Sequence, residues 1–194
     1  MRLIGHVKLV QVQQASLKVG EKPDRRYDPA PLCVVDSLEL SADGVTGVNW
    51  DGGRIVDVHH AIHPQTKNNA GTNPISLGFT SHYRAMRERF GEHLTDGSAG
   101  ENILIACERA MTLADLGRQV VIQSASGEQV RLDVLSDAPP CEPFSQFAAG
   151  SRIAGGELKA ALQFLQAGMR GYYVALTPGQ SAPTVQAGDS VYCA

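Results

Sequence analysis

The sequence predicts a mainly β protein, a closed or nearly closed β barrel that carries two or three short helices. Glycine (20 residues) and proline (10 residues) interrupt the 194-residue chain often, and the apolar stretches between them are short and rich in Val, Ile and Leu. The candidate strands and helices do not alternate regularly, as they would in a doubly wound sheet. A barrel fits this pattern because it buries one face of each strand without β-α alternation.

Short apolar segments give eight candidate strands. In the segment 129–135, Val130, Leu132 and Val134 alternate with charged residues, which is the period of a sheet with one solvated face. The polar residues 124–127 before it are typical of a hairpin turn. The strands are expected at 3–13, 32–40, 54–59, 102–105, 118–123, 129–135, 172–176 and 189–193.

Two segments have helical spacing instead. The first is expected to begin with Ser81 as its N-cap and to end at Gly91, with Tyr83, Met86 and Phe90 on one face. The second begins near Glu157 and stops at Gly168, and its apolar face consists of Leu158, Ala161, Leu162 and Leu165. The stretch 18–31 is expected to be a surface loop.

Composition excludes several classes of function. The net charge is −3, and residues 1–97 hold eleven basic and eleven acidic side chains against six and nine in 98–194, so no basic block favours nucleic acid. The longest apolar runs have five residues, too few for a membrane helix. No signal-peptide pattern is present at the N-terminus. We expect one cytoplasmic domain over 1–194, with neither nucleic acid nor a membrane as a partner.

Cys141 has the most unusual surroundings of the four cysteines. The segment 138–144 places three prolines around this thiol, so we expect a rigid loop after the strand 129–135. A fixed thiol is suited to metal ligation or to nucleophilic sulfur chemistry, and the alternative is a buried structural cysteine. Cys33, Cys107 and Cys193 lie in or beside apolar strand patterns and are interpreted as small core residues.

The segment 57–63 concentrates Asp57, His59, His60 and His63. Such a composition occurs at zinc and non-haem iron sites. On a strand, however, Asp57 and His59 share a face while His60 points away, so we expect no structural zinc site here. In the alternative interpretation, Asp57 accepts a hydrogen bond from His59 and fixes a polar loop.

Three further segments are candidates for ligand binding. The polar loop 63–74 offers Lys67 for a phosphate and Asn68 as a hydrogen-bonding group, unless its polarity serves only solvation. Gly100, Glu101 and Asn102 precede a strand, where glycine permits either close ligand approach or a tight turn. Arg170 lies in Gly-Met-Arg-Gly, which is suited to an anion or to a helix end with a solvated arginine.

Taken together, Gly100-Glu-Asn-Ile103, Ala138-Pro-Pro-Cys141, Gly168-Met-Arg-Gly-Tyr172 and Ala187-Gly-Asp-Ser-Val191 resemble the motifs of the MOSC domain family, named after the C-terminal domain of molybdenum cofactor sulfurase. Their order and spacing fit as well. Asn73-Pro-Ile-Ser-Leu77 resembles the family's strand ahead of its G-E-N motif. The resemblance covers roughly residues 40–193.

The resemblance implies a MOSC-type β barrel with Cys141 as the hallmark cysteine. In the family this residue is proposed to carry sulfur as a persulfide, or to coordinate molybdenum in members that reduce N-hydroxylated compounds. The G-E-N motif maps onto Gly100, Glu101 and Asn102. A Gly-Asp-x-His element maps onto residues 56–59, with Asp57 and His59 conforming and Val56 in place of the glycine.

Three hypotheses follow for the function. The first is a protein that binds molybdenum cofactor (molybdopterin), or handles its sulfur, through Cys141, with Lys67 and Arg170 toward the phosphate and Asn68, Glu101 and Asn102 toward the pterin. The second is a non-catalytic persulfide carrier. The third is a hydrolase that pairs Cys141 with His59 or His82.

The chain's length leaves no room for the pyridoxal-phosphate desulfurase domain of eukaryotic sulfurases, or for a flavin or iron–sulfur module. Pyridoxal phosphate is therefore implied only at the level of the family. We expect a sulfur donor such as a cysteine desulfurase, or an electron-donor protein, to act in trans.

Overall fold

Seven strands close into a barrel, which confirms the predicted fold class. The computed structural model describes residues 1–67 and 71–193. Within them the strands follow the order β14-β10-β11-β12-β8-β9-β1, and β1 pairs back onto β14. The edge strand β4 continues the sheet from β1. All pairs in this sheet are antiparallel except β8 with β9, which are parallel.

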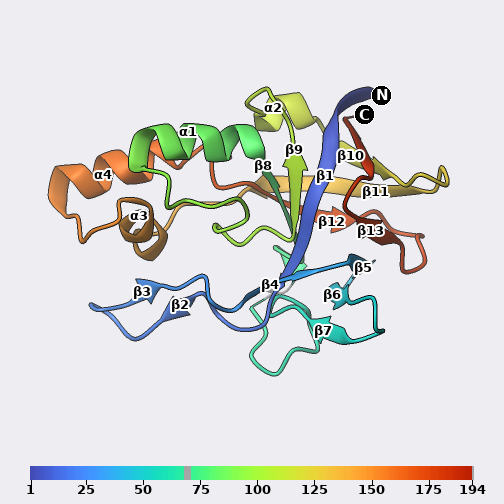
Figure 1. Cartoon of the computed structure of the whole chain (residues 1–194), viewed down its shortest axis with the longest axis horizontal. Helices are drawn as coiled ribbons and strands as arrows, with labels where there is room; N and C mark the ends of the chain where they lie inside the picture. Colours follow the sequence, from blue (N-terminus) through green and yellow to red (C-terminus); the bar gives the residue numbers. More distant parts are fainter. Residues whose placement is uncertain (68–70, 194) are drawn as a thin grey trace.

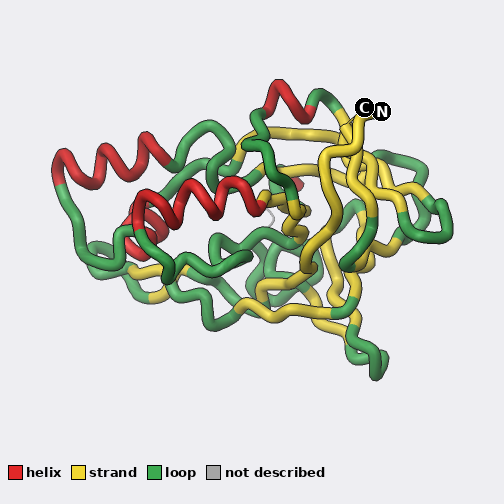
Figure 2. Tube along the Cα trace, turned by 45° about the horizontal axis from the view of Figure 1, so that its top comes forward, coloured by secondary structure: helices red, strands yellow, loops and turns green. Residues whose placement is uncertain are grey.

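The described residues form fourteen strands and four helices (Figures 1 and 2). The strands are β1 (Arg2–Gln13), β2 (Lys18–Val19), β3 (Arg26–Tyr27), β4 (Leu32–Val35), β5 (Ser37–Ser41), β6 (Gly44–Val48), β7 (Arg54–Val56), β8 (Ile75–Phe79), β9 (Ile103–Ala106), β10 (Gln119–Gln123), β11 (Gln129–Asp137), β12 (Tyr172–Leu176), β13 (Thr184–Gln186) and β14 (Ser190–Cys193). The helices are α1 (Thr80–Phe90), α2 (Leu113–Leu116), α3 (Glu142–Ala148) and α4 (Gly155–Phe164).

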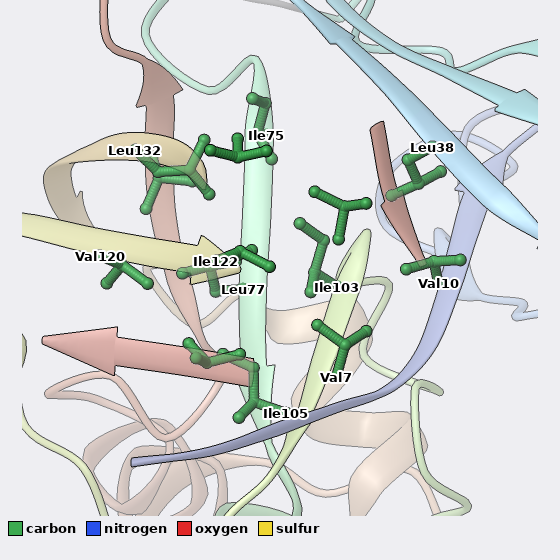
Figure 3. Packing of buried hydrophobic residues seen from close by; sticks show 14 of the residues in the cluster. Val7, Val10, Leu38, Ile75, Leu77, Ile103, Ile105, Val120, Ile122 and Leu132 are labelled. Carbon is green, nitrogen blue, oxygen red and sulfur yellow. The ribbon is translucent and has the colours of Figure 1, made fainter. Parts of the chain in front are cut away.

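The barrel interior is filled by branched aliphatic side chains. Figure 3 shows Val7, Ile103 and Ile105 directed toward the side chains of neighbouring strands. Leu38 of β5 joins this cluster, so the second sheet, in the order β13-β5-β6-β7, packs on the barrel. Burial of one such side chain contributes roughly 1.5–3 kcal/mol. On β11, Val130 and Leu132 are buried and Arg131 is exposed as predicted, whereas Asp133 and Val134 are both partly buried.

A separate cluster lies under the helices. Tyr83 and Met86 of α1 are fully buried there beside Phe144 of α3 and Leu165 after α4. Helices α1, α3 and α4 gather on one side of the molecule, and most of the barrel lies on the other side (Figure 1). The protein therefore has two hydrophobic cores, one inside the barrel and one under the helices. The segments that connect the barrel to the helices are held in place by both cores.

The two predicted helices exist with shifted ends. Helix α1 ends at Gly91 as expected, but its N-cap is Phe79, and Ser81 donates to the carbonyl oxygen of Arg109 instead of capping the helix. Helix α4 begins at Gly155 and ends at Phe164, before the expected stop at Gly168. Helix α2 has a capping box, which the sequence interpretation missed: Thr112 and Asp115 exchange hydrogen bonds.

The expected loop after the strand 129–135 is present but short: residues 138–141 have no regular secondary structure, and a helix that was not predicted follows them. Cys141 is the N-cap of α3, and Pro143 lies within the first two positions of that helix. Proline is tolerated there because these backbone N–H groups have no partner inside the helix. The thiol is therefore placed where this loop ends and a short helix begins.

Several strand predictions needed correction. The segment 32–40 divides into β4 and β5, and 54–59 ends at Val56. The stretch 18–31 is not simply a surface loop, because it contains the β2–β3 hairpin and the buried Tyr27. Strand β13 was missed because it has only three residues, and β6 because two of its five residues are glycines, which are depleted in strands.

None of the helices in the described ranges combines the length and the apolar character needed to cross a membrane. Two cysteines, Cys107 and Cys193, are buried as expected, while Cys33 is only partly buried against the barrel core.

We predict that Gly171→Ala destabilises the protein more than Gly188→Ala. Both glycines have a φ in the left-handed region, +98° and +94°, so each substitution costs about 1 kcal/mol of backbone strain. A Cβ at Gly171 would also collide with the carbonyl oxygen of Leu77, whereas at Gly188 it meets no atom within 4 Å. The collision adds about 1–3 kcal/mol. Urea unfolding of both variants measures the difference, and equal losses would contradict the prediction.

Candidate functional site

A cleft of about 780 Å³ brings together six of the residues predicted from the sequence. It is bordered by the end of β1, the β2–β3 hairpin, the loop after β7 and the segments that lead into β8, β9, α3 and β12. These segments are far apart in the sequence. The predicted residues in its lining are His59, Lys67, Gly100, Glu101, Cys141 and Arg170.

Cys141 and Arg170 lie side by side in the lining of the cleft. The Nη1 atom of Arg170 lies 3.8 Å from Cys141 Sγ, and its guanidinium carbon lies 4.2 Å from the centroid of the Phe144 ring. The guanidinium is therefore placed to stabilise negative charge on the sulfur or on a ligand beside it. Cys141 is half-buried and lines the cleft, so its thiol is reachable.

Arg170 is held by the backbone on two sides. Nη2 donates to the carbonyl oxygen of Ala99 at 3.0 Å, and Nη1 donates to that of Pro139 at 3.4 Å. Its Nε atom is buried and has no hydrogen-bond partner among the described residues. Arg170 is therefore fixed by the protein, in contrast to the freely solvated arginine of the alternative interpretation.

Glu101 is a buried carboxyl group in the wall of the cleft. It is only 3% exposed, and the hydroxyl of Tyr83 donates to its Oε2 atom at 2.7 Å. The same hydroxyl accepts from the backbone N–H of Ala99 at 2.8 Å. Burial raises the pKa of Glu101, and this effect outweighs the opposing hydrogen bond from Tyr83 and the charge of Arg170.

Asn102 points away from the cleft, although it follows Glu101 directly. Its Oδ1 atom accepts from Ser76, and its Nδ2 atom donates to Asp57 at 3.0 Å. It is therefore part of the support behind the cleft, and the sequence interpretation that gave it a ligand contact is not favoured by this geometry.

Asp57 belongs to the same support. Its carboxylate accepts from the backbone N–H of Gln13 at 2.7 Å and from the backbone N–H and Nδ1 of His59 at 2.8 and 2.9 Å. The two residues lie in a turn and not on one strand face, but they do form the predicted hydrogen bond. Asp57 thus fixes the loop that carries His59 and Lys67 to the cleft.

The other histidines of this segment have local roles. The Nδ1 atom of His60 accepts from the backbone of Ile62, and that of His63 accepts from Gln65. Across residues 1–67 and 71–193, no group of three or more His, Cys, Asp and Glu side chains is placed to hold a metal ion. Asn68 lies outside the described residues.

His82 does not border the cleft. It is a buried residue of α1 that packs against Phe79 and Tyr172, and its Nε2 atom lies 2.9 Å from the carbonyl oxygen of Met111. Burial lowers its pKa. Among the lining residues, His59 is therefore the only histidine left that could pair with Cys141 in a hydrolase. His59 is already hydrogen-bonded to Asp57.

The sequence interpretation missed the cations of the β2–β3 hairpin. Lys18 and Arg25 line the cleft together with Lys67 and Arg170, against the single acidic side chain of Glu101. The cleft is therefore basic in a protein whose net charge is −3. The sequence signal for these cations was the high density of charged residues in 18–31. That density alone does not show whether the side chains face solvent or the cleft. A basic cleft favours an anionic ligand.

We predict that Glu101→Gln makes stability less dependent on pH. A raised folded-state pKa means that the protonated form contributes stability below the ordinary value of 4.5, and that this contribution is lost as the pH rises through the folded-state pKa. Glutamine stays neutral and still accepts from Tyr83. The free energy of unfolding of the variant, relative to the parent, should therefore increase from about pH 4 to about pH 7. Urea titrations measure it, and a constant difference would rule out this assignment.

Comparison with known proteins agrees with the fold. No family model and no curated protein matches the chain. Among solved structures, YuaD from Bacillus subtilis is 13% identical over 98% of this chain and 96% of its own, with a TM-score of 0.59. A hypothetical protein is 14% identical over 98% and 67%, with a TM-score of 0.58.

YiiM from Geobacillus stearothermophilus is 12% identical over 98% of this chain and 73% of its own, with a TM-score of 0.50. At such identities the matches show the fold alone. They extend over nearly the whole chain, including the first forty residues, which the sequence motifs did not cover. Since YuaD and YiiM are MOSC-domain proteins, this chain has the MOSC fold.

Proposed function

We propose that the cleft binds a molybdenum pterin cofactor, with Cys141 as its protein ligand. The observation that supports this most directly is the thiol of Cys141 beside the fixed guanidinium of Arg170 in a basic cleft. A thiolate is a suitable ligand for a soft metal centre. The pterin brings sulfur ligands of its own, so one protein thiolate suffices.

The residues present fit such a cofactor in size and charge. A volume of about 780 Å³ is in the range of cofactor pockets, which is about 300–1,000 Å³. Lys18, Arg25 and Lys67 provide positive charge for the phosphate. The buried Oδ1 atom of Asn73, which lines the cleft, has no partner among the described residues and matches the N–H donors of a pterin.

Each residue would have a distinct part in the site. Bound molybdenum supplies two-electron redox and oxygen-atom transfer chemistry. Cys141 would hold the metal, Arg170 would balance the negative charge around the sulfur, and Glu101 would present a buried carboxyl group to the cleft. Reduction of N-hydroxylated compounds would fit this arrangement, with electrons from a donor protein in trans.

The second candidate is a persulfide carrier that accepts sulfur on Cys141 from a donor such as a cysteine desulfurase. The specific observation in its favour is that Cys141 borders two cavities, the cleft and a smaller one beside it. A carrier thiol needs room for donor and acceptor, and requires no metal.

We predict that Cys141→Ser lowers bound molybdenum or transferable sulfur at least about tenfold, because the oxygen of serine replaces neither role of the thiolate. The thermal unfolding temperature should change little, since Cys141 is only half-buried and serine has nearly the same shape. The protein is produced in a host that makes molybdenum cofactor and in one that does not. Metal analysis, pterin fluorescence and mass spectrometry of persulfide are compared for both.

Cys33→Ser is the matched control, because Cys33 is also partly buried but lies outside both cavities. Molybdenum that depends on Cys141 supports the cofactor proposal, and persulfide without molybdenum supports the carrier. Retention of molybdenum and persulfide at parental levels in Cys141→Ser would refute both.

A further inference from the structure

A second cavity of about 430 Å³ borders Cys141. We call it the hairpin cavity. Lys18, Arg25 and Cys141 border both this cavity and the main cleft, whereas Lys22 borders only the hairpin cavity. Its complete lining is Lys18, Lys22, Pro23, Arg25, Cys141, Glu142 and Pro143. Cys141 thus stands where the two cavities adjoin.

The hairpin cavity carries an excess of positive charge. Lys18, Lys22 and Arg25 line it, and Glu142 is its single acidic side chain. Within the described part of the chain none of the three cations forms an ion pair. Asp24, which lies between Lys22 and Arg25 in the sequence, pairs with Arg152 at 3.2 Å. The cations are therefore available to an anion from solution.

These cations are anchored relative to the thiol. The hairpin carries Tyr27, whose ring packs on Phe144 and Phe147 of α3 with centroid distances of 5.0 and 5.1 Å. The hydroxyl of Tyr27 donates to the carbonyl oxygen of Ser98 at 2.8 Å. The hairpin lies beside α3 in Figure 1, and Cys141 is the N-cap of that helix. One aromatic cluster therefore fixes both walls of the hairpin cavity.

We propose that the hairpin cavity binds a small anionic sulfane-sulfur donor of the thiosulfate class, which loads sulfur onto Cys141. This inference rests on the sulfur-handling role of Cys141 proposed above. A compact dianion matches three cations, and its terminal sulfur would meet the thiol at the junction of the two spaces. Arg170, on the cleft side, is placed to stabilise the negative charge of the product.

The transfer needs no further reactant. The Cys141 thiolate attacks the terminal sulfur of thiosulfate, and a new S–S bond forms from the thiolate's electron pair. The S–S bond of the donor breaks, and its electron pair leaves with sulfite. The products are the Cys141 persulfide anion and sulfite, so the total charge is unchanged and no proton, oxidant or reductant is consumed.

The test measures persulfide formation on Cys141 and sulfite release from thiosulfate. The double variant Lys22→Gln, Arg25→Gln should lower the second-order rate constant about tenfold, because oppositely charged sites raise association rates by about 10–10³. Added salt should slow the parent in the same way. Lys159→Gln, Arg118→Gln is the matched control, since it removes two exposed cations that border neither cavity. The control should react like the parent.

Alkylation of Cys141 by uncharged iodoacetamide, followed by peptide mass spectrometry, reports the reactivity of the thiol itself. We expect iodoacetamide to alkylate Cys141 of the double variant at the same rate as in the parent, whereas thiosulfate should load sulfur onto it more slowly. Parental loading of the double variant, or equal slowing with both reagents, would overturn the inference. A parent that reacts with iodoacetamide but not with thiosulfate would also overturn it. Dependence of bound molybdenum on Cys141 would then still support the proposed function.

Discussion

The closure of the barrel by β1 is the constraint on which the rest of the structure depends. This twelve-residue strand pairs with β14 at its beginning, with β9 in its middle and with β4 at its end. Pairing of the first strand with the last removes two sheet edges and brings the termini together, as Figures 1 and 2 show. Since a closed barrel fixes the position of every strand end, it also fixes the segments that build the cleft.

The geometry of the cleft is determined by the closed barrel and by the helices. The segment before β9 places Glu101 in the lining of the cleft, whereas Asn102 bonds to Ser76 and Asp57 behind it. Arg170 reaches Cys141 because the chain enters β12 beside the segment that leaves β11, where Tyr172 pairs with Asp137. A fixed arginine beside a thiol is therefore a consequence of strand pairing.

The charge of the cleft differs in sign from the net charge of the molecule. Acidic residues outnumber basic ones in the chain as a whole, yet Lys18, Arg25, Lys67 and Arg170 line the same cleft as Cys141. Asp24, the acid next to Arg25 in the sequence, is paired with Arg152. The local field thus favours anionic ligands, which fits a phosphate-bearing cofactor and a sulfur donor alike.

The sequence by itself determined the class of fold and most of the residues around the thiol. Short apolar strands with period-two alternation indicate a β barrel, and proline around Cys141 with glycine around Arg170 marks positions of unusual backbone. Such signals depend only on residues that are close together in the sequence, so they can be recognised without knowledge of the fold. They did not show that Pro143 starts a helix, because proline disfavours the interior of a helix but not its first turn.

Only the tertiary structure decided which residues meet. It turned Asn102 away from the cleft, gave Asp57 a supporting role and brought the cations of the hairpin to Cys141. A charged residue in a loop has the same sequence signature whether it faces solvent or a cavity. Lys18 and Cys141 are 123 residues apart, so their proximity follows from long-range pairing and aromatic packing, which no local pattern encodes.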